Sequence, residues 1–139
     1  MTIELETLQE LNRCQISDMQ KVGESLDPDA PGSCEIFSQK VFDVQCAIVN
    51  TYQIVAYFSL REPDPAKVAG WWKQVSEVCD TALKTLKGLK DVYPHCAASD
   101  LYDMILDFKL GAEKRRWANE QDAECLKTSL PIGLFQKTS

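Results

Sequence analysis

Two arginines and an asparagine lie close together in the last third of the chain, at a spacing that could form a binding site. Arg115, Arg116 and Asn119 fall where an apolar helical stripe containing Ala112 would continue, because such a stripe recurs about every 3.6 residues. Polar residues at expected core positions break the binary pattern, and such breaks tend to mark functional sites. A guanidinium binds a carboxylate or phosphate through two parallel hydrogen bonds. The cluster therefore predicts a pocket for a small anionic ligand or a nucleotide.

Two aromatic residues from other predicted helices, Tyr52 and Trp72, could bound this pocket. Aromatic rings commonly line ligand pockets between the helices of a bundle. Packing of both rings in the core is the alternative. The arginines also have simpler explanations: they extend past the rim of the bundle into solvent, or they pair with an acid such as Asp43.

Few residues could act as a catalytic base. The single histidine, His95, follows Pro94 in a predicted turn, and Asp107 and Glu113 are the other candidates. One histidine excludes the paired Glu-x-x-His motifs of a di-iron bundle, and neither a phosphate-binding glycine loop nor a nucleophile elbow is present. Nothing in the sequence calls for a cofactor, and catalysis is the less favoured interpretation.

The cysteine pattern bears on metal binding and on redox state. No two cysteines form a CxxC pair, and none has a histidine at ligand spacing, so the sequence predicts no metal site. The cysteines are widely spaced in a chain of 139 residues, which is long enough to stabilise its own core. We therefore predict six free thiols, no disulfide and a cytoplasmic location. The six are Cys14, Cys34, Cys46, Cys79, Cys96 and Cys125.

Composition restricts the classes of partner. The chain carries a net charge of −6, with 45% hydrophobic and 26% charged residues, which is typical of one soluble globular domain. The acidic balance disfavours nucleic acid, because phosphate backbones need a dense basic footprint. No apolar run is long enough for a membrane span. The first ten residues lack the basic start and apolar block of a secretory signal.

Prolines and glycines divide the sequence into helical segments that must position these residues. Pro28–Gly32, Pro63–Pro65 and Pro94 mark three breaks between segments with 3.6-residue apolar periodicity. This order predicts an all-α, antiparallel, up-down-up-down four-helix bundle over residues 1–129, followed by a short apolar tail over residues 130–139. A three-helix core with the first helix swapped or packed on a partner is the alternative. The predicted helices cover residues 3–25, 33–60, 65–91 and 99–127.

The last predicted helix carries a second apolar stripe on the side opposite its core face. Leu106, Leu110 and Trp117 form this stripe. Either the apolar tail segment Leu130–Phe135 or a second subunit is expected to cover it, since exposed apolar patches usually mark interaction sites. We predict a homodimer, and we interpret the protein as one that acts through protein contact, as adaptors, inhibitors or immunity-type proteins do. Ligand binding at the arginine cluster, with or without catalysis, is the alternative.

Overall fold

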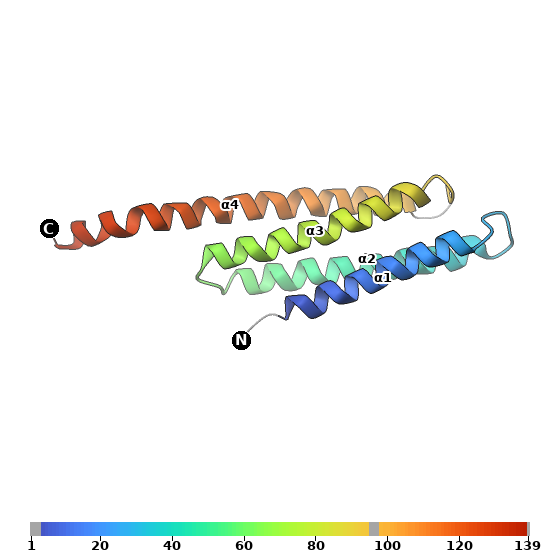
Figure 1. Ribbon diagram of the computed structural model, residues 1–139, viewed down its shortest axis with the longest axis horizontal. Coiled ribbons are helices and arrows are strands. Elements are labelled where there is room, and N and C mark those ends of the chain that lie inside the picture. Colours follow the sequence, from blue (N-terminus) through green and yellow to red (C-terminus); the bar gives the residue numbers. More distant parts are fainter. Residues whose placement is uncertain (1–3, 95–97, 139) are drawn as a thin grey trace.

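Four helices make up most of the part of the chain that the structure describes. The computed structural model describes residues 4–94 and 98–138, and in the last helix it describes side chains as far as Thr128. Consecutive helices run in opposite directions, with their connections at alternating ends (Figure 1), and the part of the chain described contains no strand. The predicted four-helix, all-α fold is confirmed. The helices are α1 (Leu5–Ser25), α2 (Ser33–Ser59), α3 (Pro65–Leu89) and α4 (Ala98–Thr138).

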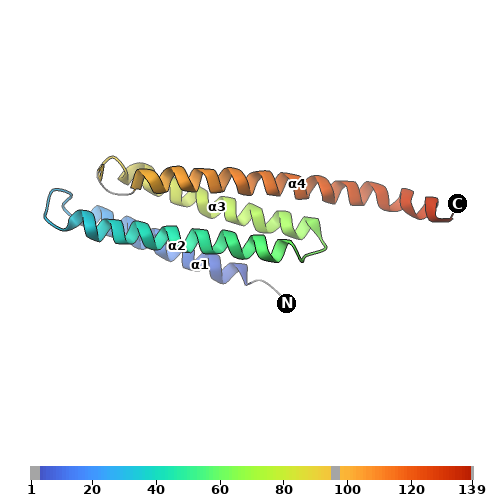
Figure 2. The same ribbon diagram turned by 180° about the vertical axis from the view of Figure 1, so that it is seen from behind.

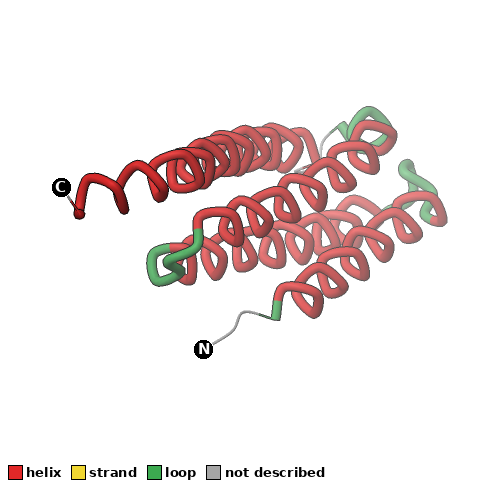
Figure 3. The backbone as a smooth tube through the Cα atoms, turned by 60° about the vertical axis from the view of Figure 1, so that its left-hand side comes forward, coloured by secondary structure: helices red, strands yellow, loops and turns green. Residues whose placement is uncertain are grey.

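Turn chemistry explains where the helices begin. The α1–α2 connection ends at Gly32, whose φ of 83° is left-handed and suits a residue without a Cβ. At the start of α3, the Asp64 carboxylate accepts a hydrogen bond of 3.0 Å from the Ala66 amide, and Pro65 occupies the first turn. Figure 3 shows the α1–α2 and α2–α3 connections as loops at opposite ends of the bundle.

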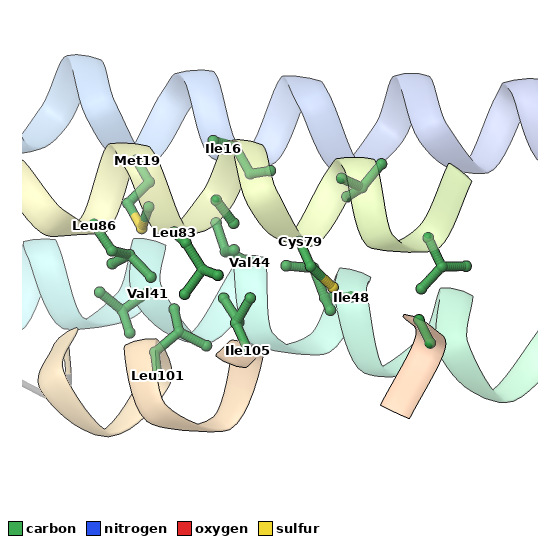
Figure 4. Packing of buried hydrophobic residues seen from close by; sticks show 14 of the residues in the cluster. Ile16, Met19, Val41, Val44, Ile48, Cys79, Leu83, Leu86, Leu101 and Ile105 are labelled. Carbon is green, nitrogen blue, oxygen red and sulfur yellow. The ribbon is translucent and has the colours of Figure 1, made fainter. Parts of the chain in front are cut away.

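The bundle core is built from aliphatic side chains of all four helices, which point toward a common axis (Figure 4). α1 contacts α2 and α3, whereas α4 contacts α3 and α2, so within the described residues α1 and α4 lie diagonally and do not touch. The predicted apolar stripes supply most of this core, but Leu11, which the periodicity places on the stripe of the first helix, is 48% exposed. The residues labelled in Figure 4 are Ile16, Met19, Val41, Val44, Ile48, Cys79, Leu83, Leu86, Leu101 and Ile105.

One polar pair lies inside the core, between α1 and α2. Asn12, which is 1% exposed, donates from Nδ2 to Thr51 Oγ1 at 2.7 Å and to the Leu8 carbonyl at 2.8 Å. The Thr51 hydroxyl in turn donates to the Ala47 carbonyl at 2.9 Å. These bonds satisfy the Asn12 Nδ2 and the Thr51 hydroxyl, whereas the buried Asn12 Oδ1 has no hydrogen-bond partner among the described residues.

Close contacts join α1 to α2 and α3 near the α1–α2 turn. The Tyr93 hydroxyl donates a buried hydrogen bond of 2.8 Å to the Gly23 carbonyl, and the Tyr93 ring stacks on Phe37 with centroids 4.1 Å apart. Burial raises the pKa of Tyr93 above its ordinary value. A Cβ on Gly23 would lie 2.9 Å from both Leu89 and Phe37. Gly23 therefore allows α1 to sit against α2 and α3 at this end.

α4 is longer than the sequence predicts. It was expected to end at residue 127, but its backbone remains helical to Thr138 and passes through Pro131. A proline removes a single hydrogen bond of the helical ladder, which can kink a helix without ending it. Because Pro65 at the start of α3 borders the same groove as Leu126, α4 extends past the rest of the bundle beyond this point. Figures 1 and 2 show this projecting end.

The prediction of six free thiols is wrong. Cys34, in the first turn of α2, is disulfide-bonded, whereas Cys14, Cys46, Cys79 and Cys125 are free. Cys96 lies outside the described residues. Sequence spacing does not report which thiols a fold brings together, so the cysteine pattern could not exclude this bond. Because disulfides persist mainly in oxidising compartments, the argument for a cytoplasmic location loses its basis.

Thiol titration in denaturant tests this bond. Protein purified without reductant should show fewer reactive thiols than fully reduced protein, which has six cysteines. The count should rise to six after reduction, because each disulfide blocks the thiols that form it. Equal counts before and after reduction would contradict the bond.

Candidate functional site

The stripe that α4 presents away from the core remains uncovered by the described residues. Leu106, Leu110 and Trp117, which we call the outer α4 face, are 38%, 49% and 64% exposed. On the core side of the same helix, Ile105 and Ala112 are fully buried. The helical phase that the sequence predicts for α4 is therefore correct. Whether the segment after residue 129 or another molecule covers the outer α4 face stays a prediction.

A second region centres on Arg115, at the same end of the bundle as the α2–α3 turn. Arg115 Nη1 donates to the Tyr52 hydroxyl at 2.6 Å and lies 3.4 Å from the Gly111 carbonyl. Its guanidinium carbon stands 5.4 Å from the ring centroids of both Tyr52 and Trp72. The structure thus brings together three of the residues that the sequence places in one site. The rings support the guanidinium by cation–π attraction.

The two aromatic rings are themselves fixed by packing. Tyr52 meets Trp72 edge-on with centroids 5.0 Å apart, and it contacts Phe108 at 4.9 Å. Trp72 is 1% exposed, so the core-packing alternative for this residue is also correct. Its Nε1 is buried and has no hydrogen-bond partner among the described residues. Such an unpaired donor is uncommon, because burying it without a partner costs free energy.

The three residues of the predicted cluster do not border one groove. Asn119 stays near Arg115: its Nδ2 donates to the Arg115 carbonyl at 2.7 Å, and both side chains border one groove. Arg116 instead pairs with Glu120 at 2.6 Å and borders a separate groove beside the first turns of α3. One residue along a helix is a rotation of about 100°, which separates neighbouring side chains. Arg116 therefore cannot join Arg115 in binding one compact anion.

The groove beside Arg115, which we call the Arg115 groove, has a volume of about 590 Å³ and lies where the end of α2, the start of α3 and the middle of α4 meet. Its walls are largely apolar. Among the described residues, Arg115 has no carboxylate within ion-pair distance, and Asp43 accepts instead from Gln39 at 3.1 Å. The ion pair with Asp43, which stood as one example, is therefore not formed, whereas the ion-pair explanation is correct for Arg116, which pairs with Glu120. The principal wall residues are Tyr57, Leu60, Val68, Trp72, Arg115 and Asn119.

Gly111 is part of this arrangement, and sequence reasoning missed it. A Cβ at Gly111 would lie 2.8 Å from the Tyr52 hydroxyl. The absence of a side chain at Gly111 therefore leaves room for that hydroxyl. The signal was a glycine inside a helix, four residues before Arg115 and thus on the same face. The role of this glycine depends on Tyr52 of α2, which lies far away in the sequence.

The candidate catalytic bases do not converge on the groove. Glu113 accepts a hydrogen bond of 3.2 Å from Ser76 on α3, and Asp107 is exposed. His95 lies outside the described residues. Over the described ranges, no three or more His, Cys, Asp or Glu side chains are arranged to hold a metal ion.

The other perturbed groups lie in the α3–α4 contact. Asp80 accepts from Lys84 at 3.0 Å and Lys109 at 3.1 Å, and these bonds lower the pKa of its carboxyl while the Asp80 bond raises the pKa of Lys109. Burial raises the pKa of Cys79 to about 12, so this thiol stays protonated and unreactive at neutral pH. These groups join two helices rather than form a reaction centre.

Within the residues that the structure describes, no helix combines the length and apolar character needed to cross a membrane. The chain matches no protein-family model, no curated protein and no solved structure.

Proposed function

We propose that this protein works through protein–protein contact, and that the outer α4 face joins it to a second copy of the chain. The exposed side chains of Leu106, Leu110 and Trp117 carry this proposal. Burying each of them in an interface is worth roughly 1.5–3 kcal/mol as an upper estimate. Helical bundles serve as adaptors, inhibitors and immunity proteins, and the fold does not choose among these roles.

A second copy fits this face for reasons of geometry. The stripe runs along the longest helix of the chain, which spans 41 residues. Two such helices can lie side by side about a two-fold axis, so that the same apolar residues meet from both partners. The backbone of residues 130–138 continues α4 in line and does not turn back over the stripe. A covering subunit is therefore favoured over an internal tail.

Light scattering of the Trp117→Glu variant tests the proposal. We expect the wild-type protein to have the mass of a dimer and the variant that of a monomer, because a carboxylate buried in an apolar contact loses its hydration. The matched control is Leu11→Glu, which changes a 48% exposed leucine on α1, the helix that does not touch α4. This control should keep the dimer mass.

Two results would overturn the dimer. One is a wild-type protein that stays monomeric as its concentration rises. The other is a Trp117→Glu variant that keeps the dimer mass while remaining folded by circular dichroism. Leu106→Glu provides an independent test of the same face, at a residue that is 38% exposed.

A further inference from the structure

We propose that the Arg115 groove binds a small carboxylic acid whose carboxylate pairs with Arg115 and whose apolar body lies against Tyr57, Leu60 and Val68. The site is separate from the outer α4 face and does not depend on dimer formation.

The first observation is an available cation. A guanidinium offers five N–H donors, and the contacts of Arg115 within the described residues engage Nη1 only, with Tyr52 Oη and the Gly111 carbonyl. No carboxylate of the described chain neutralises it, and the side chain is exposed. By contrast, Arg116 already pairs with Glu120 at 2.6 Å. Arg115 is thus a positive group with donors to spare.

The second observation is that this cation is held in place before any ligand arrives. Its guanidinium stands 5.4 Å from the ring centroids of Tyr52 and Trp72, and both rings are fixed by core contacts. Stacking against aromatic rings and a bond to Tyr52 restrict the long side chain, so less entropy is lost when a ligand binds. The absence of a side chain at Gly111 preserves this arrangement.

The third observation is that the groove wall offers apolar surface and donors but no competing anion. Trp72 lines the groove, whereas its Nε1 is closed off from solvent and therefore from a ligand in the groove. No aspartate or glutamate is among the described residues that line the groove. The charged group that can meet a ligand is therefore Arg115, and a carboxylate oxygen is an acceptor with negative charge.

The shape and charge of the groove select the ligand class. Its volume of about 590 Å³ is in the range of small-molecule sites. Tyr57 and Leu60 expose 52% and 85% of their surface, which an apolar ligand body can cover. With Arg116 directed elsewhere, the groove has one arginine rather than two. One arginine beside an apolar wall suits a singly charged amphipathic acid better than a nucleotide, because the phosphates of a nucleotide need more hydrogen-bond donors.

Isothermal titration calorimetry with phenylbutyrate tests the proposal, and phenylbutanol provides the matched neutral compound. We expect saturable binding of phenylbutyrate to the wild-type protein at one site per chain. Arg115→Gln should weaken it by about tenfold or more, which is the effect of losing one charge-assisted contact. Arg116→Gln, the control on the neighbouring residue, should change the affinity by less than about twofold. Phenylbutanol should bind more weakly than phenylbutyrate.

Three outcomes would overturn this inference: no saturable binding of phenylbutyrate to wild type, equal losses in the two arginine variants, or equal affinity for the acid and the alcohol. Arg115→Lys keeps the charge but not the planar fork, so it should bind with intermediate affinity if the pairing is bidentate. Light scattering of the same samples separates the two proposals, because Arg115→Gln leaves the outer α4 face intact and should not change the oligomeric mass.

Discussion

Replacing Trp72 with alanine should lower the free energy of unfolding by about 3–5 kcal/mol, the usual cost of truncating a buried aromatic side chain. Trp72 is 1% exposed and belongs to the largest buried side chains of the core. Its removal would leave a cavity under Arg115 and take away the edge-on contact with Tyr52. Chemical denaturation followed by circular dichroism measures the loss without relying on tryptophan fluorescence.

The neighbouring tryptophan supplies the control for this experiment. Trp71 is half-buried, and Lys67 Nζ lies 5.8 Å from its ring centroid. Trp71→Ala should therefore cost clearly less than Trp72→Ala. Trp72→Phe should keep most of the stability, because it retains an aromatic ring and removes the unpaired Nε1. Equal losses for the two alanine variants would contradict the assignment of Trp72 to the core.

Gly23→Ala should destabilise the protein, although alanine is the better helix former. The added Cβ would lie 2.9 Å from Phe37 and from Leu89. Phe37 is fully buried and stacked on Tyr93, so its ring has little room to move. Overpacking costs about 1–3 kcal/mol, against a helix-propensity gain of about 1 kcal/mol. We expect a net loss of stability and a lower melting temperature.

Gly88→Ala is the matched control, and it should have the opposite sign. A Cβ at Gly88 meets nothing within 4 Å, and the residue lies exposed within α3. This variant should gain roughly 0.5–1 kcal/mol, because it reduces the freedom of the unfolded chain without a clash. If both glycine variants were stabilising, the close approach of α1 to its neighbours at Gly23 would be wrong.

Local sequence signals determine most of this fold. Prolines and glycines at the three breaks set the helix ends and starts on either side to within a few residues. Apolar periodicity identifies core residues such as Phe37 and Ile105. The end of α4 was not predictable in the same way. The Leu130–Gly133 segment contains two residues that often end helices, but neither must do so.

The candidate site was predicted only in part, because it depends on contacts between distant segments. Helical phase alone places Arg115 toward Tyr52 and Trp72, and this proved correct. Adjacent residues point about 100° apart on a helix, so Arg115 and Arg116 cannot both face one groove, and grouping them misplaced Arg116. Gly111 escaped notice because its role is to leave space for a hydroxyl from α2.

The buried Asn12–Thr51 pair has a consequence for how the helices choose their alignment. Aliphatic stripes are nearly interchangeable, so α1 could slide along α2 by a heptad and still meet apolar partners. In such slipped packings Asn12 would keep its bond to the Leu8 carbonyl of its own helix but lose the bond to Thr51, at a penalty of about 1–3 kcal/mol. Only the native alignment brings the Thr51 hydroxyl to 2.7 Å from Asn12. The Asn12–Thr51 hydrogen bond thus favours one alignment of α1 along α2, as single buried asparagines do in coiled coils.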